Sequence, residues 1–178
     1  MHPSLERLLA AYRDPGSEAD RQRQRGRRVA RVLGTDVPRE LLIAAGFVPI
    51  RLVERPGIPT PMTDALMGAA ELPPRSRSLL EAILEVPVDD TIVISHSEAQ
   101  FPQLFAILRE VAKMKEAHLG RVHFVDLKHL PRASTHRYNL ARLHELRNSL
   151  APGLTDDALK AAMDAVDEQA RLLHLVMS

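Results

Sequence analysis

The apolar residues of the chain fall into two kinds of run, and the two kinds alternate. Short runs rich in β-branched residues predict buried strands at 29–33, 47–52, 91–95 and 122–127. Apolar residues spaced three and four apart predict helices at 40–45, 65–70, 76–84, 99–117 and 135–150, and a last helix after residue 155. Strands that alternate with helices in this way form parallel sheets. The pattern therefore predicts an α/β fold that is Rossmann-like, with a mainly parallel sheet flanked by helices.

The segment 29–52 predicts a complete strand–helix–strand unit. Its first strand ends in turn residues, and Asp36 is a good helix N-cap. Pro38 then falls in the first helical turn, where its missing N–H costs no hydrogen bond. Gly46 ends the helix, because glycine accepts the left-handed conformation that helix ends favour. In units of this kind the loop after the first strand is a common place for ligands.

Two predicted helices near the ends of the chain have apolar stripes. The first stripe comprises Leu5, Leu8, Leu9 and Tyr12, and the second comprises Leu159, Met163, Val166, Ala170, Leu173 and Met177. The second stripe is interpreted either as internal core or as a coiled-coil-like contact with a partner. A lobe of this size covers so much apolar surface with difficulty, so we expect a homodimer or a complex with a different subunit.

Length and charge limit the classes of function. The 178 residues suffice for one well-packed core, and a net charge of +1, from 24 basic and 23 acidic residues, argues against a nucleic-acid partner. Arginines concentrated between residues 21 and 31 suit a phosphate contact, but a solvated helix explains them better because no aromatic residue is interleaved with them. We divide the chain into an N-terminal helix and basic linker, 1–28, and an α/β lobe with C-terminal helices, 29–178.

The sequence contains no cysteine, which excludes disulfide bonds and fits a reducing cytoplasm. No apolar run reaches the roughly 18 residues of a membrane span. The first residues also lack the pattern of a signal peptide. We therefore expect a soluble, cytoplasmic protein with no membrane partner.

Residues 37–52, VPRELLIAAGFVPIRL, resemble the signature of the 2-hydroxyacyl-CoA dehydratase D-component and benzoyl-CoA reductase subunit family. In that signature a strand ends in a cysteine, a Pro-Glu-Glu-Leu helix follows, and the segment closes with Ala-Ala-Gly and Pro-Val-Arg-Leu. The matching positions are Pro38, Glu40, Leu41, Ala44, Ala45, Gly46, Pro49, Arg51 and Leu52. The resemblance implies a Rossmann-like lobe from a protein that acts on acyl-CoA thioesters. With weaker motifs it extends to the C-terminus, and it then covers about half of a family subunit.

The same resemblance implies a 4Fe-4S cluster held by three cysteines. In this sequence the three positions fall near Gly34, near Pro73 and at Ser97, which is followed by Glu98. None of these residues supplies the soft thiolate that an iron–sulfur cluster requires. We therefore expect that the family's 4Fe-4S cluster is absent, and we predict no other cofactor.

Three predicted loops follow strands, and in an open parallel sheet such loops converge on one crevice. The loops are 34–36, 95–98 and 128–132. They provide histidines, carboxylates, hydroxyls and cations, which suit acid–base catalysis or the binding of a phosphate or thioester. The catalytic candidates are His96 and Glu98, and the ligand-binding candidates are Thr35, Asp36, Arg51, Ser95, Ser97, Lys128, His129 and Arg132.

An alternative interpretation gives the residues of these loops structural roles only. Asp36 and Ser97 would then be helix caps, Glu98 would occupy a first helical turn, and the cations would be solvated. No histidine pair has the His-Glu-x-x-His spacing of helical zinc sites, so we predict no metal site.

Two classes of function fit these features. The first is a cluster-free relative of the dehydratase subunits that acts as a binding or partner subunit, for an acyl-CoA-like ligand. The alternative is a cluster-free enzyme, of lyase or hydrolase type, that uses acid–base residues in the crevice on a substrate such as a thioester. The loss of all three thiolates favours the first.

Overall fold

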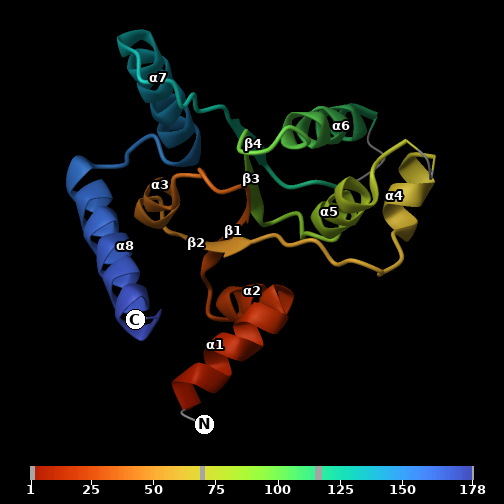
Figure 1. Ribbon diagram of the computed structural model, residues 1–178, viewed down its shortest axis with the longest axis horizontal. Coiled ribbons are helices and arrows are strands. Elements are labelled where there is room, and N and C mark those ends of the chain that lie inside the picture. The colour runs from red at the N-terminus through yellow and green to blue at the C-terminus, as the bar shows by residue number, and fades with distance from the viewer. Residues whose placement is uncertain (1–2, 69–70, 115–117, 178) are drawn as a thin grey trace.

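A computed structural model describes residues 3–68, 71–114 and 118–177 (Figure 1). Its strands are β1 (Arg28–Leu33), β2 (Phe47–Arg51), β3 (Thr91–Ser95) and β4 (Val122–Val125). Its helices are α1 (Pro3–Arg13), α2 (Pro15–Gln24), α3 (Arg39–Ala44), α4 (Pro61–Leu66), α5 (Pro74–Leu84), α6 (Phe101–Met114), α7 (Ala133–Leu150) and α8 (Asp156–Met177). In these ranges no helix has both the length and the apolar character that crossing a membrane requires.

The four strands form one sheet in the order β2-β1-β3-β4, and each neighbouring pair is parallel. This confirms the predicted α/β fold with a parallel sheet flanked by helices. All five residues of β3 are buried, as expected for a central strand that is covered on both faces. Because the strands are parallel, the loops that follow them leave from the same edge of the sheet.

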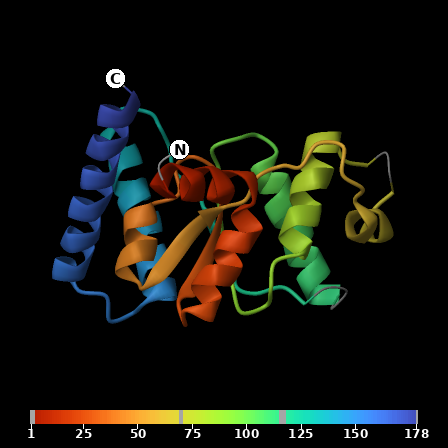
Figure 2. The same cartoon turned by 90° about the horizontal axis from the view of Figure 1, so that it is seen from below.

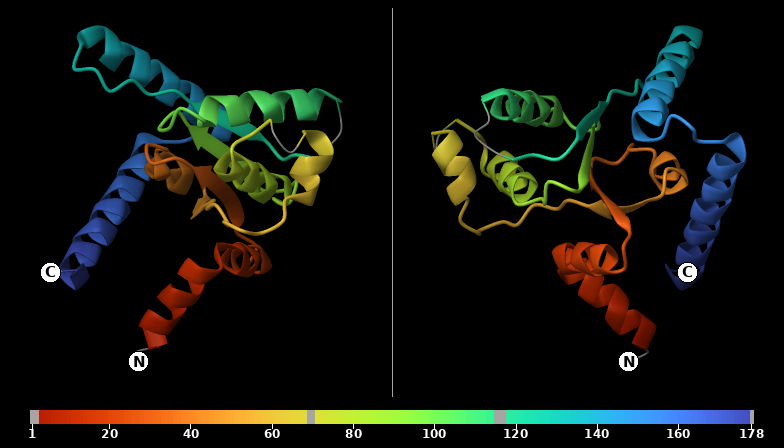
Figure 3. Two further views of the ribbon diagram at one scale, coloured as in Figure 1. Left: turned by 45° about the vertical axis from the view of Figure 1, so that its right-hand side comes forward. Right: turned by 180° about the vertical axis from the view of Figure 1, so that it is seen from behind.

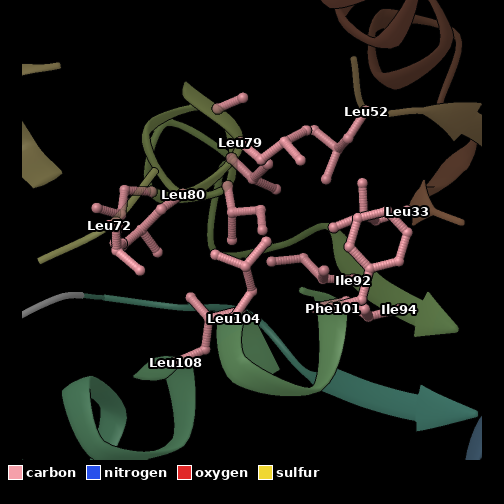
Figure 4. Close-up of a cluster of buried hydrophobic side chains, with 14 residues drawn as sticks. Leu33, Leu52, Leu72, Leu79, Leu80, Ile92, Ile94, Phe101, Leu104 and Leu108 are labelled. Atoms are coloured by element: carbon pink, nitrogen blue, oxygen red, sulfur yellow. The ribbon is translucent and has the colours of Figure 1, made fainter. Parts of the chain in front are cut away.

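Helices α5 and α6 cover one face of the sheet, and an aliphatic cluster lies beneath them (Figure 4). Leu80 of α5 and Leu104 of α6 meet Ile92 of β3 in this cluster, and all three side chains are fully buried. Near the start of β1, α2 extends the cover through Ala19, which packs against Val29.

Helices α3 and α7 cover the opposite face. Ala30 of β1 and Val93 of β3 are buried there with Leu42 of α3 and Leu146 of α7. Outside this layer, α8 packs along α3, as the two views of Figure 3 show. From below, α8, α3 and α7 lie together at one side of the sheet and α5 and α6 at the other (Figure 2).

The apolar stripe of α8 is only partly core. Val166 is 7% exposed, whereas Met163 and Leu173 are 49% and 52% exposed. On α1, Leu5 and Leu8 are 46% and 65% exposed. The side chains of Tyr12 and Met177, which the sequence assigns to the same stripes, lie outside the described residues.

The predicted helix cap at Asp36 is wrong. Helix α3 begins at Arg39 with Pro38 at the N-cap position, and no side chain caps it. Val37 precedes a proline, which disfavours the helical conformation and so delays the helix. Gly46, by contrast, has the predicted left-handed conformation, with a φ of +82°.

Other boundaries also differ from the prediction, most of them by one or two residues. The helix expected at 65–70 lies earlier, as α4, because Pro61 fits its first turn. The helix expected at 99–117 is α6, which starts at Phe101. Strand β4 ends at Val125 rather than at residue 127. Residues 69–70 and 115–117, which the predicted helices included, lie outside the described residues.

Strand β2 lies at an edge of the sheet and contains Pro49. The N–H of Leu52 donates to the carbonyl of Val32 in β1. Backbone N–H groups alternate in direction along a strand, so the nitrogen of Pro49 faces away from β1. The proline therefore removes no hydrogen bond from the sheet.

Candidate functional site

The loops after β1 and β3 touch each other at the carboxyl edge of the sheet. The backbone N–H of Thr35 donates a hydrogen bond of 3.1 Å to Oγ of Ser97. Oγ of Ser95 lies 3.3 Å from the same oxygen. Three of the predicted ligand-binding residues are thus brought together by the pairing of β1 with β3.

Gly34 makes this contact possible. Its φ is +110°, and a Cβ at this position would lie 2.0 Å from Oγ of Ser95 and 2.8 Å from Oγ of Ser97. Any other residue would be strained in its backbone and would collide with the two serines. The floor of the candidate site is therefore the backbone of Gly34 beside two hydroxyl groups.

Asp126, directly after β4, organises a second group of side chains. Its carboxylate is 2.8 Å from Nδ1 of His96 and 3.1 Å from Nζ of Lys128. It also accepts a hydrogen bond of 2.6 Å from the hydroxyl of Tyr138 on α7. Burial raises the pKa of Asp126, but the hydrogen bonds from Tyr138, His96 and Lys128 outweigh that effect and bring it to about 2. The carboxylate is therefore ionised and holds His96 by one ring nitrogen.

A third contact joins the loops after β1 and β4, although β3 lies between these strands. Nε2 of His129 is 3.1 Å from Oδ2 of Asp36. The same loop is fixed to α7, because the backbone N–H and carbonyl of Lys128 each form a 2.8 Å hydrogen bond with the Asn139 amide. The loop after β4 is therefore held between the loop after β1 and α7.

Glu98 is separated from His96 by its bonding partners. Its carboxylate is 2.5 Å from Nη1 of Arg75, on the first turn of α5. Arg75 also forms an ion pair with Glu54, in the segment after β2. The two predicted catalytic residues therefore belong to two halves of the edge, with His96 facing α7 and Glu98 facing α5.

The helix-cap and first-turn roles considered for Asp36, Ser97 and Glu98 are not the observed ones, whereas the exposure of Arg51 and Arg132 agrees with the solvated cations of that interpretation. Asp36 caps no helix, and α6 begins only at Phe101, so neither Ser97 nor Glu98 lies in its first turn. Arg51 and Arg132 are exposed, and within the described residues their side chains form no hydrogen bond or ion pair. Direct contacts thus join five of the ten candidates, and Asp126 links His96 with Lys128. Glu98 contacts Arg75 instead, and the two exposed arginines lie outside these contacts.

Sequence reasoning missed Asp126, Tyr138 and Arg75. Asp126 lies within a run that was predicted as strand, so it was treated as part of the sheet. A polar residue at the carboxyl end of an apolar strand is a usable signal. Tyr138 and Arg75 lie on helices, and only the packing of those helices brings them to the edge.

Two cavities adjoin the candidate site. One, of about 310 Å³, lies between the segment after β2 and α5 and is lined in part by Arg75. The other, of about 280 Å³, lies between β4 and α7 and is lined in part by Asp126 and Tyr138. Each half of the edge therefore has its own space for a ligand group.

The three positions of the implied cysteines do not fit a 4Fe-4S cluster. Gly34, Pro73 and Ser97 offer no thiolate, and iron–sulfur clusters are held by thiolates. Within the described ranges no three histidine or carboxylate side chains are grouped so that they could hold a metal ion. A scan of the chain against protein-family models and a search of curated proteins give no match.

Proposed function

We propose that this chain is a cluster-free relative of the 2-hydroxyacyl-CoA dehydratase subunits. It acts as a binding or partner subunit and holds an acyl-CoA-like ligand at the carboxyl edge of its sheet. The observation that supports this most directly is the close approach of Gly34 to Ser97. These are two of the positions at which the resemblance implies cluster cysteines, and a Cβ on the first would lie 2.8 Å from Oγ of the second. Ligands of one cluster come from loops that meet, as the loops that carry these two residues do.

The third position gives further support. Pro73 is the N-cap residue of α5. Two residues later, Arg75 bonds to Glu98, the neighbour of Ser97 in sequence. Helix α5, which starts directly after the third position, is therefore connected to the loop after β3 by a side-chain contact. A family subunit would place a cluster there, and this chain has a glycine, a proline and a hydroxyl group instead.

The donors at the edge suit ligand binding better than redox chemistry. The Thr35 side chain is exposed beside the serine pair, and the Lys128 ammonium is exposed beside Asp126, so both can bind carbonyl or phosphate oxygens. With a net charge of +1 the chain has no general attraction for nucleic acid. We further propose a cytoplasmic location, where the absence of disulfides has no cost.

A partner surface is the second part of the proposal. α8 presents Leu172, Leu173 and Leu175 at 49–59% exposure. Beside it, an apolar hollow of about 250 Å³ between α3, α7 and α8 is lined in part by Leu41 and Leu143. Apolar surface of this kind supports a homodimer or a complex with a partner subunit.

Native mass spectrometry of the purified chain with added acetyl-CoA tests both parts. We expect a complex with acetyl-CoA that weakens in the double variant Ser97→Ala/Lys128→Gln. The control Lys113→Gln removes an exposed lysine in the last turn of α6, outside both proposed surfaces, and should change nothing. No complex at millimolar acetyl-CoA would contradict the ligand, and a monomer at all concentrations would contradict the homodimer.

The proposal also predicts that the protein purifies without an iron–sulfur cluster. The reason is the donor set of Gly34, Pro73 and Ser97, which gives iron no thiolate. Iron and acid-labile sulfide are measured after anaerobic purification. Near-stoichiometric amounts of both would contradict this prediction and leave the fold unaffected.

One observation favours an enzyme as a second candidate function. Ionised Asp126 holds the His96 ring at Nδ1. The His96 side chain is 40% exposed, so its other ring nitrogen, Nε2, is available as a general base. A lyase or thioester hydrolase could use this arrangement. Release of free coenzyme A thiol from acetyl-CoA, lost in His96→Gln and shifted in its pH dependence in Asp126→Asn, would support it. Absence of thiol release by the wild-type chain would count against it.

A further inference from the structure

A cavity of about 310 Å³ lies beside α5, in the half of the edge that faces away from His96. Its walls are the segment that follows β2 and the first turns of α5. Three arginines, Arg55, Arg75 and Arg77, line it together with one carboxylate, Glu54. Hydroxyl groups of Thr60 and Ser78 lie among them. The lining therefore has two more positive charges than negative ones and several hydrogen-bond donors.

The other carboxylates that neutralise these arginines do not line the cavity. Glu85 is 2.5 Å from Nη2 of Arg55, and both side chains are more than a third exposed. Glu98 approaches Arg75 from the loop after β3, and the Arg75 side chain is 49% exposed. Ion pairs with this much exposure contribute little net stability. A doubly charged anion that binds two guanidinium groups at once can therefore replace them.

The cavity is also built before any ligand arrives. The backbone N–H of Arg55 donates a 2.7 Å hydrogen bond to Oγ of Ser78, which fixes the segment after β2 against α5. Gly57 turns that segment with a φ of +78°. The Arg77 side chain is only 14% exposed and is bonded to Asp64. Because the walls of the cavity and the Arg77 side chain are already fixed, they lose little conformational freedom when an anion binds.

We propose that this cavity binds a phosphate group, as a phosphate monoester or a pyrophosphate. Arg55 and Arg75 provide its main contacts, and binding displaces Glu54 from Arg75. The site adjoins the serine pair, because Arg75 also contacts Glu98. A ligand with phosphate at one end and a thioester at the other can therefore reach both. This extension to an acyl-CoA-like ligand rests on the proposed function, whereas the phosphate site does not.

Calorimetric titration of the full chain with inorganic pyrophosphate tests the site. We expect saturable binding that weakens about tenfold or more in Arg55→Gln and in Arg75→Gln, because each loses a charge-assisted contact. Glu54→Gln should bind more tightly, since it removes the one carboxylate in the lining. The matched control is Arg171→Gln, which removes an exposed arginine paired with Glu168 on α8 and should leave the affinity unchanged.

Two results would overturn the phosphate site. One is the absence of saturable binding at millimolar pyrophosphate, and the other is equal affinity in the wild type, Arg55→Gln and Glu54→Gln. A cooperative thermal unfolding transition shows for each variant that it is folded. Arg55 and Glu54 form one exposed ion pair each, so we expect their variants to fold and to test the site even if Arg75→Gln does not fold. Displacement of pyrophosphate by coenzyme A supports the extension to an acyl-CoA-like ligand. If pyrophosphate binds and coenzyme A does not displace it, the extension fails and the phosphate site stands.

Discussion

Asp90 and Asp126 lie at opposite edges of the sheet, and the fold treats their charges in opposite ways. Asp90 precedes β3, is 2% exposed and accepts a 2.6 Å hydrogen bond from Arg23 of α2. Burial raises its pKa, against the opposing effect of Arg23. Asp126 follows β4 and has donors around it that bring its pKa to about 2, although burial alone would raise it.

The difference is that Asp90 forms a structural ion pair, whereas the groups around Asp126 can still contact a ligand. At the amino edge, Asp90 and Arg23 connect α2 to the sheet, and the half-buried Arg31 has a buried Nε with no hydrogen-bond partner among the described residues. At the carboxyl edge, His96 and Lys128 keep 40% and 48% of their side chains exposed. Charges at the first edge serve the fold, and those at the second remain accessible to a ligand.

Alanine substitutions at the two aspartates should show the difference between the two edges most strongly. Asp90→Ala removes the buried partner of Arg23, which then keeps only the exposed Asp20, and should lower the free energy of unfolding by about 3 kcal/mol. Asp126→Ala removes an acceptor whose donors can turn to water, so about 1 kcal/mol is expected. Urea denaturation measures both. Equal losses would show that the two edges do not differ in this way.

Gly34→Ala should have the next largest effect. The new Cβ meets Oγ of Ser95 and also forces alanine into a positive φ, so a loss of about 2 kcal/mol or more is expected. Gly46→Ala is the control, because its φ is also positive but nothing lies within 4 Å of its Cβ position. It should lose about 1 kcal/mol. Similar shifts in melting temperature for the two variants would argue against tight packing at the serine pair.

The dependence of stability on pH should distinguish the two aspartates. The pKa of Asp126 is about 2 in the fold and 3.8 ordinarily, so its stabilising effect is complete above 3.8 and is lost as the pH falls toward 2. Asp90 has a raised pKa, so the fold binds its proton more readily than the unfolded chain does. Its contribution therefore declines as the pH rises from 3.8 through the folded value.

Unfolding free energies between pH 2 and pH 6 or so test these signs. Asp126→Asn should flatten the loss of stability on the acid side, and Asp90→Asn should remove the decline above 3.8. If the unfolding free energies of both variants depend on pH as that of the wild type does, the pH dependence comes from other groups.

The smallest effect is expected for His129→Gln. The His129 side chain is 72% exposed, so its ion pair with Asp36 should contribute less than about 0.5 kcal/mol. The contact still fixes the loop after β4 to the loop after β1. Amide NMR signals of Thr35 and Lys128 should therefore shift, although the melting temperature does not. A large drop in melting temperature would mean that this contact has a structural role.

Much of the sheet could be predicted from the sequence, because short β-branched runs have few alternatives in a chain of this kind. Residues 91–95 were predicted as a strand and form one from end to end. The convergence of the loops at one edge also followed from parallel pairing alone. Boundaries at helix ends were less certain, because Asp36 has the chemistry of a cap but the sequence Val37-Pro38 delays the helix.

The pairings within the candidate site could not be predicted. Asp126 and Tyr138 are twelve residues apart, and Glu98 and Arg75 are twenty-three residues apart. Such contacts depend on how α7 and α5 pack against the sheet. The spacing of apolar residues three and four apart predicts a helix, but it does not specify that packing. The candidate residues were therefore identified as a set, and their division into two halves came from the structure.

The proline in β2 bears on how two copies of this chain could join. An exposed edge strand offers a row of backbone donors, and another chain can pair with them to extend the sheet. Pro49 interrupts that row, since its nitrogen faces outward and has no hydrogen. A continuous intermolecular sheet through β2 is therefore disfavoured. The homodimer proposed above should instead form through helices, where α1 and α8 present their exposed leucines.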